Sequence, residues 1–339
     1  MYTFKGKKIN YPICIHFLCG NKYKKYRDDD KRNIIMNYIN SFKNNYALIL
    51  ERYFKVSDYL DLGFEDLEKV ELMASHYAKS IIIIHETNST AGEIALFGSK
   101  SDLKDKILVI YPPESLIEVN NVGAFLREAF FKNDKIVNMP YLFDAKLNEK
   151  RFPHVRFYDT YFINNYLPDD FKQMIKDFWK SNDNAECKLS FKKKDYNRCA
   201  LDTYSINNEK KSVKIILSYD LIMSLLFGLF SNKILREQFR TFPSVDVICN
   251  LIKTILTNTI INNEGINVIN YSVKIKMMDE QQIYIPVRFW ISIMKSIGLL
   301  DVDGGKYVFS HAIDSILEEY KELIVNINEK SFFDGYLGE

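Results

Sequence analysis

The chain has 339 residues, of which 47% are hydrophobic and 14% aromatic, and its formal net charge is +2 at pH 7. This length predicts two domains with sizeable cores. Because the charges nearly balance, net charge gives no reason to expect nucleic-acid binding, and any basic surface must be local. The five cysteines form no CxxC pair and the five histidines no HExxH motif. We therefore expect neither a disulfide framework nor a metal site.

The first 20 residues lack the apolar core and the cleavage site of a signal peptide. The longest apolar run, Leu221 to Phe230, is too short to span a bilayer. Together these features predict a cytoplasmic protein with no membrane segment.

In the amino-terminal third, short apolar runs alternate with amphipathic helical patterns. We expect strands over residues 11–21, 47–54, 80–86 and 105–114, and helices over 28–46, over 64–79 and from about residue 92. Strands that alternate with helices and carry nearly continuous apolar runs indicate a parallel sheet covered on both faces. The sequence therefore predicts an α/β fold of the Rossmann or flavodoxin-like type.

The remaining two thirds change character. Residues 123–211 are aromatic and mixed in charge, and we expect a few helices there and a charged loop near 192–211. Helical patterns follow over residues 218–230, 244–261 and 286–300. A strand, a turn at Asp303-Gly304-Gly305 and a second strand come next, and a closing helix ends the series. Helices followed by a short hairpin are typical of a winged-helix domain.

The expected ligand site lies outside the carboxyl ends of the parallel strands. The small residues 89–92 would let an anionic group approach the backbone amides at the start of a helix. Glu93 falls in the expected first turn of that helix, where capping and the helix dipole also favour a carboxylate. The pattern alone leaves open both a capping role and a ligand-facing role for Glu93.

A ligand-facing Glu93 suits chemistry at the anomeric carbon of a sugar, because a carboxylate can stabilise or trap an oxocarbenium-like state. Glu51 and Glu86, expected at the ends of the second and third strands, could hydrogen-bond ribose hydroxyls. Each is also explained as a solvated residue at the rim of the sheet.

Residues 17–21 (FLCGN) and 73–98 (MASHYAKSIIIIHETNSTAGEIALFG) resemble the nucleoside 2-deoxyribosyltransferase superfamily. Within it they resemble the deoxyribosyltransferase-like effector of type II retrons, which are bacterial anti-phage systems. The resemblance covers about the first third of the chain, and a weaker one extends over the closing hairpin and helix. The turn before Glu93 departs from the Asp-Ser-Gly-Thr of the family, because no acid precedes Ser89. This departure puts a true transferase in doubt, but not a hydrolase that uses water.

The resemblance implies an N-glycosidase that cleaves the nicotinamide–ribose bond of NAD, with NAD as substrate and no cofactor. Glu93 would be the nucleophile or the oxocarbenium stabiliser. The implied substrate-binding residues are Cys19, Gly20, Asn21, Glu51, Glu86, Asn88, Ser89 and Thr90. Cys19 is equally explained as a small core residue. The implied partners are the retron reverse transcriptase and msDNA, which would hold the toxin inactive, and a homo-oligomer or filament of that complex is a further expectation.

The implied organisation is a deoxyribosyltransferase-like catalytic domain over residues 1–125, a connecting region over 126–211 and a helical, winged-helix-like domain over 212–339. The last would contact a partner or nucleic acid through Arg288, Lys295 and Lys306, although basic residues on helices are also typical of a solvated face. Two alternatives stay open. One is a nucleoside or nucleotide N-glycosidase or deoxyribosyltransferase, and the other is a non-enzymatic winged-helix regulator that binds nucleic acid.

Overall fold

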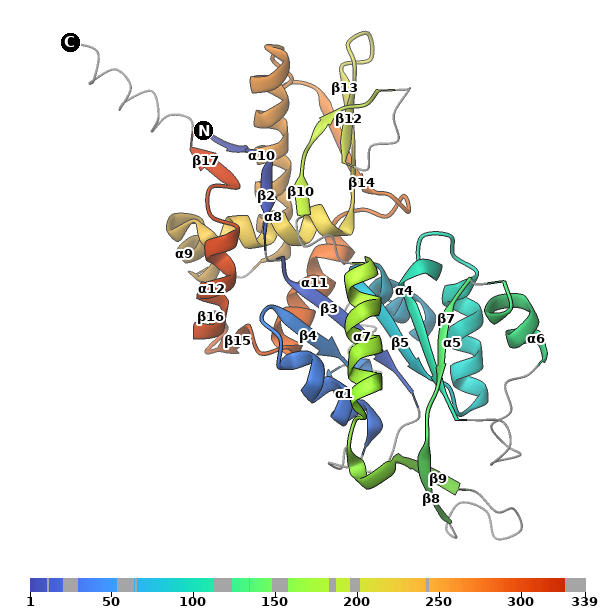
Figure 1. The fold of residues 1–339 in the computed structure, drawn as a ribbon. Helices are drawn as coiled ribbons and strands as arrows, with labels where there is room; N and C mark the ends of the chain where they lie inside the picture. Colours follow the sequence, from blue (N-terminus) through green and yellow to red (C-terminus); the bar gives the residue numbers. More distant parts are fainter. Residues whose placement is uncertain are drawn as a thin grey trace. The chain divides into compact units, whose positions relative to one another are not determined.

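The chain forms two compact units in the computed structural model (Figure 1). The structure describes residues 1–10, 12–20, 30–53, 64, 66–112, 124–133, 135–147, 158–182, 187–195, 202–241 and 244–326. One unit comprises Ile13–Asn184, and the other joins Met1–Pro12 to Ala185–Glu339. The expected divisions at 125/126 and 211/212 each lie inside one of these units. The amino-terminal strands belong to the second unit because they pair with strands late in the chain.

The first unit is built on a five-stranded sheet in which all neighbouring strands are parallel. In spatial order the strands are β4 (Asn45–Leu48), β3 (Cys14–Cys19), β5 (Ala78–Ile84), β6 (Ile107–Tyr111) and β7 (Val137–Pro140). The predicted parallel sheet is confirmed, although β3, β4 and β6 are shorter than expected and β5 begins and ends two residues earlier. The edge strand β7 was not predicted, because its sequence VNMP carries no apolar run and ends in proline.

The first unit also contains helices and a separate hairpin. They are α1 (Lys31–Asn40), α2 (Leu50–Tyr53), α4 (Leu67–Tyr77), α5 (Asn88–Gly98), η1 (Lys104–Lys106), α6 (Ala124–Leu126), η3 (Arg127–Phe131), η4 (Ile163–Asn165) and α7 (Asp169–Asn182), with the hairpin β8 (Phe143–Leu147) and β9 (Tyr158–Phe162). Leu18 of β3 joins a buried cluster with Ile35 of α1 and Ile175 of α7. The ring of Phe17 contacts Phe97 of α5. Because successive residues of a strand point to opposite faces, these contacts show helices on both sides of the sheet.

The second unit is mixed in structure. Its helices are α8 (Tyr219–Ser231), α9 (Lys233–Thr241), α10 (Val245–Glu264), α11 (Tyr284–Ser296) and α12 (His311–Glu319). Its strands are β1 (Tyr2–Phe4), β2 (Lys7–Ile9), β10 (Cys187–Leu189), β11 (Lys192–Lys193), β12 (Thr203–Asn207), β13 (Ser212–Leu217), β14 (Ser272–Met277), β15 (Leu300–Asp303), β16 (Lys306–Phe309) and β17 (Ile324–Asn326). Strand β1 pairs with β17 and β2 with β10, and β11 to β14 form a four-stranded sheet.

Two expectations for this unit have different outcomes. The predicted hairpin is confirmed, and Gly304 and Gly305 lie between its paired residues Asp303 and Lys306, at φ 55° and 75°. Positive φ at both turn positions is what a tight type I′ turn requires. The charged loop expected near 192–211 is wrong in part, because β11 and β12 lie in it. Within the described ranges, no helix is both long enough and apolar enough to cross a membrane.

Candidate active site

Helix α5 begins at Asn88, four residues before the predicted start near Gly92. The Thr87 side chain accepts a hydrogen bond from the Thr90 amide at 3.4 Å, and the Thr90 hydroxyl accepts one from the Thr87 amide at 3.2 Å. This reciprocal capping box makes the expected small-residue turn the first turn of the helix. Glu93 consequently lies in the second turn, and helix capping does not account for it.

Glu93 is half-buried, and its Oε2 atom is buried without a hydrogen-bond partner among the described residues. The thiol of Cys19, at the end of β3, donates a hydrogen bond to the Glu93 carboxylate. Burial, followed by the negative charges of Glu71 and Glu51, raises the pKa of Glu93 to about 8. An unpartnered buried carboxylate oxygen is costly in a folded protein, and such groups are typical of binding and catalytic sites.

Glu71 of α4 is a member of this cluster that sequence reasoning missed. Burial, with the charges of Glu51 and Glu68 as further causes, raises the pKa of Glu71 to about 7. A signal for it exists in the sequence: Glu71 follows Leu67 by four residues and precedes Ala74 by three, so it lies on the apolar stripe of the helix. A carboxylate at such a position is unusual and marks a site worth examining.

Cys19 and Glu51 join Glu93 as predicted from the strand ends, although Glu51 lies in the short helix α2 and not at the end of a strand. Burial, and then the charges of Glu93, Glu71 and Glu51, raises the pKa of the Cys19 thiol well above its usual range. Cys19 is therefore a hydrogen-bond donor in this site and is poorly suited to act as a thiolate.

A buried arginine holds Glu51 in the cluster. Arg32 of α1 is 1% exposed, and its guanidinium donates to the Glu51 carboxylate. The same group lies 3.5 Å from the Asp30 carboxylate and donates to the Gly20 carbonyl at 3.4 Å. The Glu51 side chain keeps 33% of its surface exposed. Arg32 thus positions Glu51 while leaving it accessible to a ligand.

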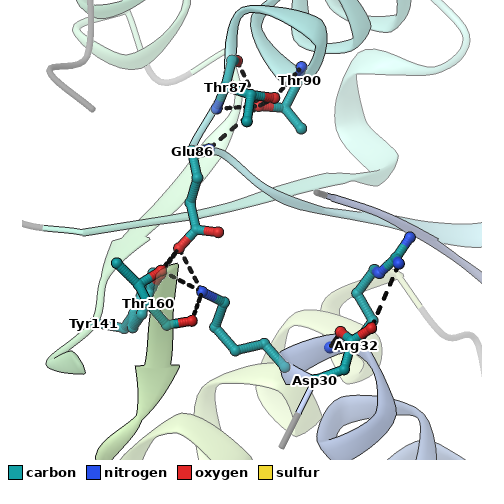
Figure 2. A network of polar contacts seen from close by, with 8 residues as sticks. Asp30, Arg32, Glu86, Thr87, Thr90, Tyr141 and Thr160 are labelled. Carbon is teal, nitrogen blue, oxygen red and sulfur yellow. Dashed lines mark hydrogen bonds and ion pairs between the residues drawn. The ribbon is translucent and has the colours of Figure 1, made fainter. Parts of the chain in front are cut away.

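Glu86 lies in a different network (Figure 2). Its Oε1 atom accepts hydrogen bonds from the hydroxyls of Tyr141 and Thr160 and lies 2.5 Å from the ammonium of Lys31. Lys31 also donates to the Thr160 carbonyl at 2.6 Å. Both charged side chains are buried, so the geometry gives Glu86 a structural role, in which it ties the end of β5 to α1 and β9. This differs from the ribose contact predicted for it.

The remaining predicted substrate-binding residues are distributed around the start of α5. Asn88 and Ser89 are exposed in its first turn, and the buried Thr90 hydroxyl lies 3.0 Å from His85 Nδ1. Asn21 lies outside the described residues. In the parts of the chain that the structure describes, no three His, Cys, Asp or Glu side chains are arranged to hold a metal ion.

The three basic residues predicted for partner contact lie in the second unit. Lys295 of α11 places its ammonium 5.3 Å from the centre of the Tyr307 ring. Burial raises the pKa of Tyr307, and the nearby charge of Arg288 opposes that shift. Lys306 is exposed beside Tyr307 on β16. The structure brings Arg288 and Lys295 together at this tyrosine, and their contact with a partner or nucleic acid stays a prediction.

The first unit is thus an α/β domain with three neighbouring carboxylates at the edge of a parallel sheet where ligands bind. Residues 28–138, about a third of the chain, match the family of the STM3845 retron effector protein. This match supports the prediction that the chain is a retron effector with an anti-phage role. It includes Glu51, Glu71 and Glu93 but not Cys19 or Gly20. Comparison with curated proteins finds no match.

The raised pKa values of Glu71 and Glu93 predict how stability depends on pH. In the folded state both carboxyls keep their protons at pH values where the unfolded chain, with an ordinary pKa of 4.5, has lost them. Their contribution is therefore full below about pH 4.5 and is lost as the pH rises through about 7 and 8. The Glu71→Gln/Glu93→Gln variant should show a flatter decline of the thermal midpoint between pH 5 and pH 8.5 than the wild type. If the thermal midpoints of the variant and the wild type fell in parallel with pH, the raised pKa values of Glu71 and Glu93 would be contradicted.

Gly20 is expected to tolerate a side chain poorly. A Cβ there would lie 3.2 Å from Arg32 Cδ and 3.3 Å from Ile84 Cβ, so these two side chains must move by a few tenths of an ångström to accommodate it. We expect Gly20→Ala to destabilise the unit by about 1–3 kcal/mol, as overpacking does. Gly92→Ala is the matched control, because a Cβ at Gly92 meets nothing within 4 Å and alanine favours the helix. Urea denaturation of both variants measures the difference, and equal midpoints would refute the expectation.

Proposed function

We propose that this chain is the toxic effector of a retron anti-phage system and that it hydrolyses the nicotinamide–ribose N-glycosidic bond of NAD, with Glu93 as the catalytic carboxylate. The observation that carries this proposal is the buried Glu93 oxygen, which has no hydrogen-bond partner among the described residues and lies beside Glu51 and Glu71 at the carboxyl edge of the sheet.

The chemistry fits a cluster of carboxylates. In the proposed reaction the bond between C1′ and the nicotinamide nitrogen breaks, and its electron pair neutralises the pyridinium nitrogen. Positive charge develops at C1′, and the Glu93 carboxylate stabilises or bonds that carbon until water attacks it. The products are nicotinamide, ADP-ribose and one proton.

The raised pKa of Glu93 is compatible with this role. Without a ligand, burial and two neighbouring carboxylates favour its protonated form. A bound pyridinium ring brings a positive charge, which favours the ionised form that the reaction needs.

Glu71 and Glu51 take the supporting roles in this proposal. A pKa of about 7 suits Glu71 to accept the proton of the attacking water near neutral pH. Glu51, held by Arg32 and partly exposed, is the residue suited to the ribose hydroxyls. The Cys19 thiol orients Glu93 by its hydrogen bond.

The order of the strands supports a flavodoxin-like, and hence deoxyribosyltransferase-like, assignment. The order β4-β3-β5-β6-β7 corresponds to 2-1-3-4-5 along the chain, in which ligands bind where the order reverses, between the first and third strands. Cys19 ends the first of these strands, and α5 with Glu93 follows the third.

The retron reverse transcriptase and msDNA are the proposed partners that hold the effector inactive. The family match and the confirmed hairpin β15–β16 support this part of the proposal. We propose that these partners contact a winged-helix-like domain at the group formed by Tyr307, Arg288 and Lys295.

The test is to incubate the purified chain, alone and with its retron partners, with NAD and to measure nicotinamide and ADP-ribose by mass spectrometry. Release of both products is the expected result. Cleavage of nucleosides in preference to NAD would replace this proposal by the nucleoside N-glycosidase or deoxyribosyltransferase. Intact NAD and nucleosides in every assembly state would overturn a glycosidase of either kind.

A further inference from the structure

The four-stranded sheet of the second unit has one face that points away from its core. Val213, Ile215 and Leu217 alternate along β13 on the buried face. On that side the Tyr204 hydroxyl donates to Glu264 at the end of α10, at 2.8 Å. The register places ten residues on the opposite face: Lys192, Thr203, Ser205, Asn207, Ser212, Lys214, Ile216, Ser272, Lys274 and Lys276. All of these except Thr203 are partly or fully exposed.

This basic sheet face carries four lysines and no carboxylate among its ten residues. Lys214 and Lys274 lie directly opposite each other on neighbouring strands, an arrangement that destabilises a sheet because like charges repel. Glu280 offsets part of the charge, since its carboxylate lies 2.5 Å from Lys276 and 3.6 Å from Lys214. Lys192 and Lys274 have no carboxylate within ion-pair distance among the described residues. The face is therefore suited to an anionic partner.

We propose that the basic sheet face binds the phosphate backbone of duplex DNA. Lys274 and Lys276 are two residues apart on one strand, which separates them by about 6.6 Å. Consecutive phosphates on one strand of B-form DNA rise by about 3.4 Å and also wind around the axis, which places them about 7 Å apart, so adjacent lysines on this face match neighbouring phosphates. The hydroxyls of Ser205, Ser212 and Ser272 add donors of the kind that contact phosphate oxygens.

The composition of the face favours a duplex over a protein or a single-stranded nucleic acid. Protein interfaces are depleted in lysine and enriched in aromatic side chains at their centres. Single-stranded nucleic acids are bound on aromatic side chains that stack with the bases. None of the ten residues of this face is aromatic. Contacts to the backbone of a double helix need only the charges and hydroxyls that are present.

The proposal is independent of the glycosidase activity, because the two involve different units and different readouts. The experiment measures binding of the full chain to a short fluorescein-labelled duplex DNA by anisotropy over a range of salt concentrations. In the Lys214→Gln/Lys274→Gln variant we expect affinity to fall about tenfold or more at low salt, and the slope of log affinity against log salt to fall by about 2. Glu280→Gln should raise the affinity, because it leaves Lys214 and Lys276 without their carboxylate partner.

The matched control is Lys233→Gln/Lys253→Gln, which removes the same charge from exposed positions of α9 and α10. Equal affinity and equal slope in the two double variants would overturn the proposal. So would a chain that does not bind duplex DNA, or one that binds single-stranded DNA or duplex RNA in its place. Circular dichroism of each variant verifies that the sheet is intact.

Discussion

Glu93→Gln is expected to lower the rate of NAD cleavage by about 10³-fold or more while the protein stays folded. Glutamine has the shape of glutamate and can still accept the hydrogen bond from Cys19, but it cannot carry the negative charge that stabilises the developing oxocarbenium ion. The readout is nicotinamide release under single-turnover conditions, together with the toxicity of the variant in cells that lack its partners.

Stability separates this catalytic role from a structural one. Because burial beside Glu51 and Glu71 disfavours the ionised form of Glu93, an uncharged glutamine at this position should leave the thermal midpoint near neutral pH unchanged or raise it. Glu128→Gln is the control, since Glu128 is an exposed carboxylate in the same unit. A Glu93→Gln variant that cleaves NAD at the wild-type rate in every assembly state would exclude Glu93 as the catalytic residue.

Lys31→Met is expected to lower the free energy of unfolding of the sheet unit by about 3–5 kcal/mol. Lys31 has no exposed surface and its ammonium lies 2.5 Å from the Glu86 carboxylate, so the substitution leaves a buried negative charge without its cation. The double variant Lys31→Met/Glu86→Leu should recover most of the loss, because replacing both partners by apolar side chains removes the uncompensated charge.

The measurement is urea denaturation followed by tryptophan fluorescence in a Trp290→Phe background. The chain has two tryptophans, Trp179 in the sheet unit and Trp290 in the other, so Trp179 then reports the sheet unit alone. Lys132→Met is the control, because the ion pair of Lys132 with Glu128 is exposed on both sides and should contribute little. Equal losses in the two single variants would refute the expected cost.

The sheet was largely predictable because its central strands are encoded locally. The isoleucines of β5 and the mostly apolar run of β3 are short stretches that are typical of a strand buried on both faces. The pairing of β1 with β17 was not predictable, since it joins residues more than 300 positions apart and neither strand has a distinctive pattern. The four-stranded sheet of β11 to β14 was not predicted, because lysines alternate with its apolar residues and the sequence is therefore similar to that of a charged loop.

The site was predicted in part for a similar reason. Glu93, Cys19 and Glu51 follow from the rule that the strand ends of a parallel sheet meet at one edge. Glu86 satisfies the same rule, but its partners Tyr141 and Thr160 come from segments of no recognisable pattern. Lys31, at the start of a helix and next to aspartates, gives no sequence signal that it is buried. The role of Glu86 is therefore decided by tertiary contacts that local sequence does not encode.

The pairing of β1 with β17 has a consequence for the order of events during synthesis. The second unit needs both ends of the chain, since β1 finds its partner only when residues 324–326 have been made. All residues of the first unit have been made once Asn184 is added. Domains fold as units while the chain grows. The first unit, with its carboxylate cluster, is therefore expected to fold before the second unit can form. If restraint acts through the second unit, as proposed, each new molecule passes through an interval in which it is catalytically complete and unrestrained.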